Sequence, residues 1–174
     1  MEIQRLEKES YVGKKFTVHY QTNGYYDIYL FDQRFQMDYV PFESTIKKSF
    51  EDAFFSEWLE YPIAFGAFEN EKLIGFIEGT LESWNNRFRI SNICVFNNTM
   101  RHKGIGTLLM ATIQKEAESL KARMIVLETQ SCNEAAIAFY QQNGFGIIGF
   151  DLYAYSNIDP EQHELRIEMG KKLK

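Results

Sequence analysis

Three short runs rich in hydrophobic residues lie near the middle of the chain between polar stretches, a pattern that favours β-strands. The runs cover residues 63–68, 73–81 and 88–96. Polar residues 69–72 separate the first run from the second, and a polar stretch at residues 83–86 precedes the third. We therefore expect a strand pair joined by a tight turn, followed by a third strand.

The next part of the chain has helical periodicity. Residues 104–120 place apolar side chains on one face of a predicted helix, namely Ile105, Leu108, Leu109, Ile113, Ala117 and Leu120. A short apolar run at residues 124–127 predicts a buried strand. A second helix is expected over residues 133–143, because Gly144 is a favourable residue just after a helix end.

The pattern before residue 60 mixes two periods. The first forty residues alternate in places, and Asn23-Gly24 predicts a turn between two edge strands. Over residues 44–59 an apolar side chain recurs at every fourth position (Ile46, Phe50, Phe54 and Trp58). This spacing predicts a helix, with Ser44 as its N-cap.

Two closing strands are expected near residues 149–155 and 164–169. The predicted order is antiparallel strands, helix, strand, helix and strands, which indicates a mixed α/β fold with helices on the faces of one sheet. The sequence contains no internal repeat, low-complexity tract or Pro/Gly/Ser-rich linker. We therefore expect one domain over residues 1–174.

Composition narrows the classes of partner. Of the 174 residues, 45% are hydrophobic and 16% aromatic, which favours a packed core over disorder. The net charge of -5, with no basic stripe, argues against nucleic acid and suits cationic small molecules. A charged N-terminus and the lack of an apolar run of about 18 residues argue against a membrane partner. Cys94 and Cys132 lie far apart, as expected for reduced thiols in a cytoplasmic protein.

A candidate anion-binding segment joins the third predicted strand to the first long helix. The first turn of a helix has unpaired N–H groups and the positive end of the helix dipole. Gly104 and Gly106 would let a phosphate approach those amides, and Arg101 and Lys103 add positive charge beside them. The segment matches neither the Walker A pattern nor the dinucleotide fingerprint. It is either an anion cradle or a helix start that is rich in glycine.

Two motifs together resemble the GNAT family of N-acetyltransferases. They are Arg101-x-x-Gly104-x-Gly106 and Asn133-x-x-Ala136-x-x-Phe139-Tyr140-x-x-x-Gly144-Phe145. The resemblance covers roughly residues 63–150. It implies a central, mostly antiparallel twisted sheet that splays between two strands, with helices on both faces. It also implies acetyl-CoA as cosubstrate, an amine as acceptor and no metal.

The resemblance assigns a set of residues to coenzyme A. Those of the helix-start segment would hold the diphosphate through backbone amides: Arg101, His102, Lys103, Gly104, Ile105, Gly106 and Thr107. Ile93, Cys94 and Val95 would present strand backbone to the pantetheine arm. Asn133 would hydrogen-bond that arm, and Ala136 and Phe139 complete the second motif.

Direct acetyl transfer needs a polarised carbonyl, a neutral amine and a proton for the departing thiolate. The Val95 N–H is the simplest carbonyl-polarising donor. The resemblance places Tyr140 against the departing sulfur as the acid. For the base we favour Glu128, with Glu78 and Glu82 as alternatives. Each of the three carboxylates could instead bind a cationic substrate or lie at the surface.

Cys94 offers a covalent alternative, in which its thiol attacks the thioester. Strand alternation points Cys94 away from the face of Ile93 and Val95, which argues against it. His19 and His163 have no metal-ligand spacing.

A closer likeness is to streptothricin acetyltransferases, through Trp84-Asn85, residues 127–130 and residues 149–151. One departure is Ser91-Asn92, where those relatives tend to carry an acidic pair. The likeness implies a streptothricin-type antibiotic as acceptor. A polyamine, a protein amine and a non-catalytic acetyl-CoA-binding regulator stay open, and an exposed final strand leaves a homodimer open.

Overall fold

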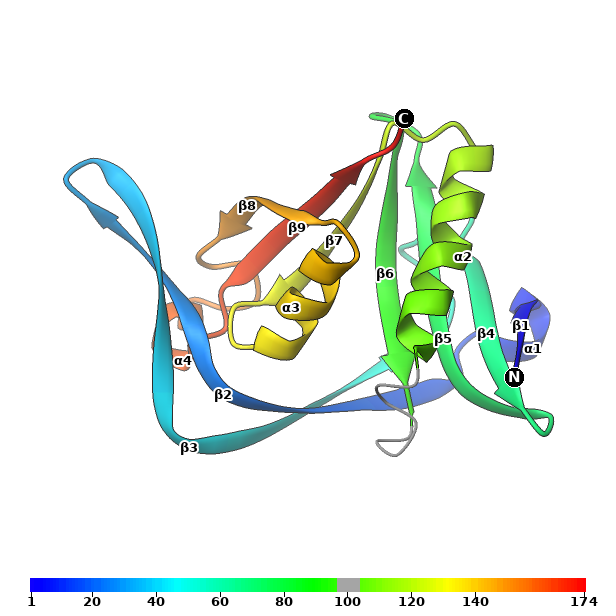
Figure 1. The fold of residues 1–174 in the computed structure, drawn as a ribbon, viewed down its shortest axis with the longest axis horizontal. Helices are drawn as coiled ribbons and strands as arrows, with labels where there is room; N and C mark the ends of the chain where they lie inside the picture. The colour runs from blue at the N-terminus through cyan, green and yellow to red at the C-terminus, as the bar shows by residue number, and fades with distance from the viewer. Residues whose placement is uncertain (97–103) are drawn as a thin grey trace. The chain divides into compact units, whose positions relative to one another are not determined.

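The computed structural model describes residues 1–96 and 104–174, and the chain forms two compact units (Figure 1). The first unit contains residues 1–18, 51–127 and 171–174, and the second contains residues 19–50 and 128–170. Residues 97–103 lie outside the described part of the chain.

The first unit is built on a mostly antiparallel sheet. Its strands are β1 (Glu2–Arg5), β4 (Ile63–Glu69), β5 (Lys72–Glu82), β6 (Arg87–Val95) and β7 (Met124–Gln130), hydrogen-bonded in the order β1-β4-β5-β6-β7. All pairs are antiparallel except β6 with β7, which is parallel. The predicted strand pair and third strand are confirmed, and the turn between β4 and β5 uses positive φ at Asn70 and Glu71.

The long helix α2 (Ile105–Ser119) packs against β4, β5 and β6, as Figure 1 shows. It buries Ile105, Leu109, Met110, Ile113 and Ala117. The predicted helix is confirmed, but Leu108 and Leu120, which we expected on the buried face, are exposed. A short helix α1 (Lys8–Tyr11) follows β1.

A second apolar cluster of this unit is rich in aromatic rings. It contains Leu6, Phe16, Phe54, Phe55, Ala64, Phe76 and Cys94. The rings of Phe54 and Phe76 are 4.3 Å apart between centroids, and those of Phe16 and Phe76 are 4.8 Å apart. The sequence between β3 and β4 is therefore part of the core.

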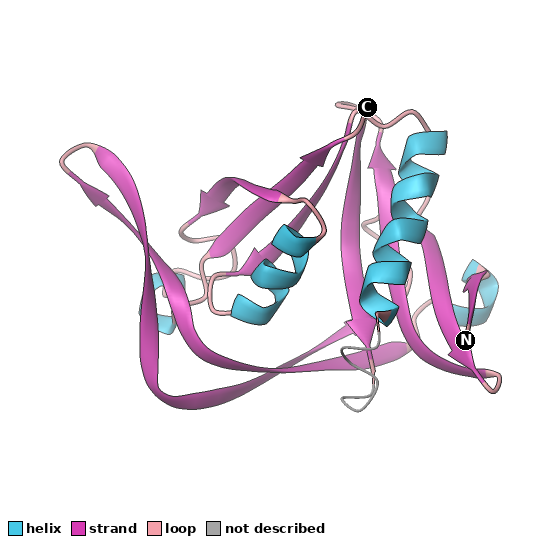
Figure 2. Cartoon of the chain, in the orientation of Figure 1, coloured by secondary structure: helices cyan, strands magenta, loops and turns pink. Residues whose placement is uncertain are grey.

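The strands β2 (Lys15–Phe31) and β3 (Arg34–Ala53) form a long two-stranded sheet, drawn in magenta in Figure 2. The helix predicted over residues 44–59 is therefore wrong. Positions 46, 50, 54 and 58 are four apart, and a spacing of four is also a multiple of the strand period of two. The spacing alone could not separate the two structures.

The turn predicted at Asn23-Gly24 is also wrong, because β2 continues through it and the chain reverses at Asp32-Gln33, where φ is 45° and 59°. A Cβ on Gly24 would lie 2.5 Å from the Tyr39 hydroxyl and from the Val40 carbonyl oxygen. Glycine is needed here because the neighbouring strand approaches closely, not because the chain turns.

In the second unit the strands are hydrogen-bonded in the order β7-β9-β8, with β8 at Gly146–Asp151 and β9 at Arg166–Lys172. The final strand is therefore internal, and β8 is the edge strand, contrary to our expectation. The predicted strand over residues 149–155 starts and ends earlier, because the chain turns after Asp151 toward the short helix α4 (Asp159–Gln162). The helix predicted at residues 133–143 is confirmed as α3 (Glu134–Gln142).

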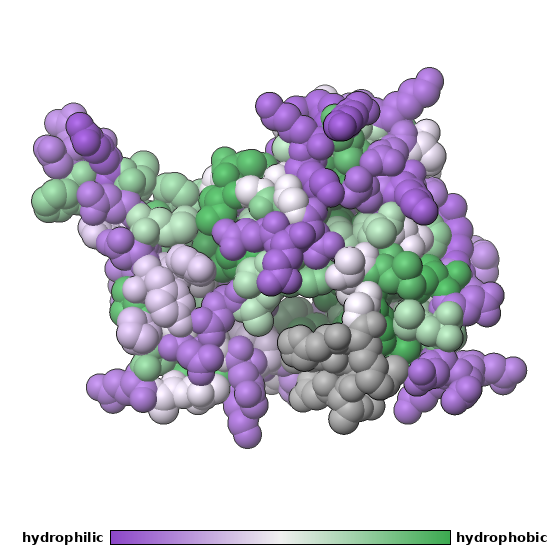
Figure 3. All heavy atoms as spheres, in the orientation of Figure 1, coloured by the Kyte–Doolittle hydropathy of each residue, from purple (hydrophilic) through white to green (hydrophobic). Residues whose placement is uncertain are grey.

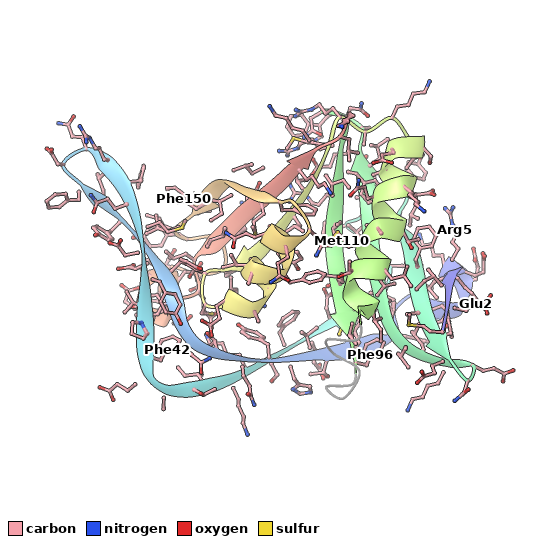
Figure 4. All side chains as sticks on the ribbon, in the orientation of Figure 1. Glu2, Arg5, Phe42, Phe96, Met110 and Phe150 are labelled. Atoms are coloured by element: carbon pink, nitrogen blue, oxygen red, sulfur yellow. The ribbon has the colours of Figure 1, made fainter. Side chains whose placement is uncertain are left out.

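The tip of the β2–β3 hairpin, at the upper left of Figure 3, carries hydrophilic side chains beside hydrophobic ones. Leu30, Phe31 and Phe35 are exposed there. The Phe35 ring contacts that of Phe150, labelled in Figure 4, with centroids 4.9 Å apart. In the described ranges, no helix has the length and hydrophobicity to cross a membrane.

Candidate active site

The β6 strand has an open edge along its second half. Its parallel ladder with β7 joins residues 87–89 to residues 124–126 and stops there. From Ile90 to Val95, β6 has no strand partner on that side within the part of the chain that the structure describes. Backbone N–H and C=O groups on such an edge can bind an extended ligand.

Three of the residues that the resemblance assigned to the pantetheine arm lie on this stretch. Ile93 and Val95 are half-buried and pair with β5 on the other edge of β6. Cys94 is buried in the aromatic cluster of the first unit, opposite Phe76. The thiol points into the core, which argues further against a covalent acetyl-cysteine.

None of the described residues obstructs the start of α2. Gly104 is the N-cap, with φ at +78°, and its carbonyl accepts the Leu108 N–H at 2.9 Å. A Cβ on Gly104 would meet no atom within 4 Å. Such a helix start, with its amides and dipole, suits a phosphate group.

Of the remaining residues in this segment, Ile105 is buried in the core, Gly106 is half-buried and Thr107 is exposed. Ile105 anchors the first turn, so the amides of the helix mouth have a fixed position. Arg101, His102 and Lys103 lie outside the described residues.

The second motif forms the start of α3 in the second unit. Asn133 is the N-cap, and its side-chain oxygen accepts the Ala136 N–H at 3.3 Å. That contact fixes the amide group and leaves its NH₂ as the donor for a ligand. Glu134 accepts the Tyr39 hydroxyl at 2.6 Å and the Asn23 N–H at 2.8 Å, so the β2–β3 hairpin is tied to this helix start.

Tyr140 lies in the last turn of α3 and is buried. Its ring centroid is 5.6 Å from that of Phe139 and 6.2 Å from that of Phe145. Burial raises the pKa of the Tyr140 phenol, because the phenolate would be poorly solvated. The phenol therefore keeps its proton at neutral pH, which suits a proton donor.

Glu128 lies among charged residues of the second unit. Arg166 contacts it at 3.4 Å and also lies 3.7 Å from both Asp151 and Glu168. One guanidinium thus faces three carboxylates from β7, β8 and β9. The side chain of Glu128 is partly exposed, so it can meet a substrate.

Glu82 is engaged by two arginines. Its carboxylate accepts the Nε–H of Arg89 at 2.6 Å and that of Arg87 at 3.1 Å. Burial alone would raise the pKa of Glu82, but the hydrogen bonds and charges of its partners outweigh this and lower it. A carboxylate held in this way is a weak base.

Glu78, in contrast, is wholly buried and lies beside a second carboxylate, that of Asp52. It pairs across the sheet with Asn92, and it accepts hydrogen bonds from the Phe55 N–H and the Ser91 hydroxyl. We did not single out Asp52 from the sequence, because it falls in the segment for which we predicted a helix.

The described residues contain no group of three or more His, Cys, Asp or Glu side chains arranged to hold a metal ion. The predicted site residues fall into both units: the β6 edge, the α2 mouth and Glu78 in the first, and α3 and Glu128 in the second.

Comparison with known proteins identifies the family. The model of the acetyltransferase (GNAT) family matches residues 25–145. The chain belongs to the GNAT acetyltransferase family. The predicted family, enzyme class and mixed α/β fold are thereby confirmed.

Two streptothricin acetyltransferases are similar to the chain over more than half of its length. Streptothricin acetyltransferase of Escherichia coli is 32% identical over 137 residues, which is 79% of this chain and 76% of that protein. Streptothricin acetyltransferase of Streptomyces lavendulae is 34% identical over 98 residues, 56% of this chain and 51% of that protein.

Solved acetyltransferase structures share the fold. The crystal structure of nourseothricin acetyltransferase aligns with a TM-score of 0.78 at 22% identity and covers 99% of this chain and 98% of that one. A candidate streptothricin acetyltransferase from Bacillus anthracis, in complex with acetyl coenzyme A, aligns with a TM-score of 0.72 at 25% identity and covers 99% of each chain.

Proposed function

We propose that this GNAT enzyme transfers the acetyl group of acetyl-CoA to an amine of a streptothricin-type antibiotic and so confers resistance to it. The similarity to the Escherichia coli streptothricin acetyltransferase carries the choice of acceptor. The net charge of -5 also suits a cationic acceptor.

Acetyl-CoA is the cosubstrate, and the described residues fit its two distinctive parts. The open α2 mouth at Gly104 suits the diphosphate, because a Cβ there would meet nothing within 4 Å. The unpaired edge of β6 from Ile90 to Val95 suits the amide-bearing pantetheine arm. In this proposal Asn133, Ala136 and Phe139 of α3 line the same arm.

The reaction needs three groups besides the donor-binding backbone. The Val95 N–H polarises the thioester carbonyl, and Tyr140 protonates the departing thiolate. Burial keeps the phenol protonated at neutral pH, so Tyr140 has a proton to give. Glu128, our choice of base from the sequence, and Glu78 are the two carboxylates left for the amine proton, because Glu82 is held by arginines.

Thiol release from acetyl-CoA tests the proposal, with streptothricin, polyamines and lysine-containing peptides offered as separate acceptors. We expect release with streptothricin, and mass spectrometry should find one acetyl group on its β-lysine arm. Release with polyamines or peptides alone would move the acceptor to those classes. Tight binding of coenzyme A without release for any amine would indicate a regulator.

A homodimer and a cytoplasmic location complete the proposal. Ile147 and Ile148 on the edge strand β8 are exposed, and together with Phe35 they line a hollow of about 310 Å³. A second copy can pair its own β8 with this edge across a two-fold axis. Light scattering should give the mass of a dimer, and Ile148→Lys should convert it to a monomer; a monomeric wild-type protein would contradict the dimer.

A further inference from the structure

The buried carboxylate pair of the first unit indicates where the proton of the acceptor amine goes, an inference that rests on the proposed acetyl transfer. Glu78 on β5 is 0% exposed. A carboxylate removed from water normally has a cationic partner. No Lys or Arg of the described chain forms an ion pair with Glu78, and the charged group that acts on it is another acid, Asp52.

The two carboxylates are held in the same manner. Glu78 accepts the Phe55 N–H at 2.8 Å with one oxygen and the Ser91 hydroxyl at 3.3 Å with the other. Asp52 accepts the next backbone N–H at 2.7 Å with one oxygen and the Asn92 side-chain amide at 3.1 Å with the other. In each acid, one carboxylate oxygen thus accepts a backbone N–H, and the other accepts a hydrogen bond from a β6 side chain. This arrangement fixes both acids without neutralising either.

Ser91 and Asn92, which contact the two acids, lie on the part of β6 that is not paired with β7. The antiparallel ladder between β5 and β6 has an irregularity between Glu78 and Gly79, beside Ser91. Bulges of this kind often redirect side chains near active sites. Ser91 precedes Val95 by four residues, about 13 Å along the strand, so a chain of several waters has to join the Ser91 hydroxyl to an amine that attacks at Val95.

We propose that Glu78 is the proton acceptor for the substrate ammonium group and that Ser91 relays the proton to it. Asp52 keeps the region negative, so that the ammonium group is attracted to it. Ser91 is a relay residue between these waters and Glu78, and Glu78 acts through Ser91.

The proton and bond changes balance. The ammonium group gives a proton to the first water of the chain, the last water gives one to the Ser91 oxygen, and the Ser91 hydroxyl proton passes to Glu78. The neutral amine then attacks the thioester carbon, so the C–N bond forms and the C–S bond breaks. The thiolate takes a proton from Tyr140, and the nitrogen of the new amide returns one to Tyr140. Glu78 finally releases its proton to water.

The acidity of Glu78 supports this assignment. Burial raises its pKa, and the charge of Asp52 adds to the rise, whereas the hydrogen bonds from Phe55 and Ser91 oppose it. Across the sheet β4 contributes Ala64, and β6 contributes the uncharged Ser91 and Asn92, so Asp52 is the titratable group that faces Glu78. A base of raised pKa takes a proton more readily at neutral pH.

A purely structural role makes a different prediction. Phe55 has a positive φ of 54°, and its N–H is satisfied by Glu78. If Glu78 served only to hold Phe55, then a glutamine, whose side-chain oxygen can accept the same N–H, would preserve activity. The isosteric change Glu78→Gln therefore separates the two roles, and it also removes the cost of burying a charge.

The test compares kcat/KM against pH for wild type, E78Q and S91A, with acetyl-CoA and streptothricin. If streptothricin gives no thiol release, the amine with the fastest release in the panel replaces it. Thr80→Val is the matched control, because Thr80 is a buried polar residue of the same strand that donates to the Glu60 carbonyl. E128Q is the competing variant. Coenzyme A affinity and melting temperature are measured for each protein.

We expect E78Q to lose about 100-fold or more in kcat/KM. The increase of kcat/KM with rising pH should be flattened, because the base that loses its proton is absent. The coenzyme A affinity of E78Q should stay at the wild-type value, and its melting temperature should not fall, because glutamine removes the cost of burying a charge. S91A should lose about tenfold, and Ser91→Asp in the E78Q background should recover much of the loss by placing a carboxylate on β6. T80V should stay within about threefold of wild type.

Wild-type activity in E78Q, or a larger loss of kcat/KM in E128Q than in E78Q, would overturn the inference. Glu128 would then be the proton acceptor. Wild-type activity in S91A would overturn the relay. If E78Q does not fold, the kcat/KM of S91A and its dependence on pH test the inference instead. Absence of release by wild type with every amine would instead overturn the proposed function, and this inference with it.

Discussion

Two regions of the first unit, the middle of β6 and the mouth of α2, have opposite electrostatic character. At the middle of β6, Ser91 and Asn92 contact the acids Glu78 and Asp52. At the mouth of α2, Gly104 opens the positive end of a fifteen-residue helix. The first region favours a cation and the second an anion.

The contrast matches the two substrates of the proposed reaction. The donor carries an anionic diphosphate, and the acceptor carries an ammonium group. A compact unit that offers one region to each can bind both without mixing their sites. The predictions below remove or alter each region, from the largest expected effect to the smallest.

Gly104→Glu should abolish the anion site. A carboxylate at this position would occupy the open space at the helix mouth and repel the diphosphate, so we expect acetyl-CoA affinity to fall about 100-fold or more. Isothermal titration calorimetry measures it. Gly13→Glu is the matched control, because Gly13 also has a positive φ, 74°, and a Cβ added to it would meet no atom within 4 Å. Equal losses in both variants would indicate backbone strain and not loss of the site.

Tyr140→Phe should leave both regions intact and slow the chemistry. Loss of the proton donor should lower kcat by about 10- to 100-fold, with little change in the KM for acetyl-CoA. Steady-state thiol release measures both constants. An unchanged kcat would return Tyr140 to a packing role on α3.

Glu82→Gln tests the acid on β5 that has cationic partners. We expect a loss of about 1–2 kcal/mol in the free energy of unfolding at neutral pH, because Arg87 and Arg89 lose a charged acceptor. The pKa of Glu82 is lowered on folding, so its contribution is present above the unfolded pKa and disappears as pH falls through the folded pKa. Urea unfolding should therefore show the loss at neutral pH and none in strong acid.

The smallest effect is expected for the contribution of Glu78 to the pH dependence of the free energy of unfolding. Its sign is opposite to that of Glu82. The pKa of Glu78 is raised on folding, so the folded state holds the proton more tightly. The free energy of unfolding should fall as pH rises from the unfolded pKa through the folded pKa. E78Q should remove this slope, and an unchanged slope in urea unfolding would contradict the assigned environment of Glu78.

The sequence predicted the parts whose signal is local. Gly104 and Gly106, the strand before them and the helix after them lie within a short segment, so one pattern was enough to predict the helix start. The face of α2 was mostly correct because helical period and burial agree there. Gly144 marked the end of α3 because its φ of 86° requires a residue tolerant of left-handed backbone.

The acidic region could not be predicted, because its members come from three separate strands. Asp52 ends β3, Glu78 lies in β5, and Ser91 and Asn92 lie in β6. Their contacts depend on strand register, which the alternation pattern does not reveal. The fourfold spacing in residues 44–59 also misassigned the segment that contains Asp52, since it fits strand and helix alike.

A crystal structure with coenzyme A bound tests the central claim most directly. We predict the diphosphate against the backbone amides of Ile105, Gly106 and Thr107, and the pantetheine arm along Ile93 to Val95. A diphosphate bound elsewhere, or a side chain filling the space at Gly104, would contradict the proposed donor site.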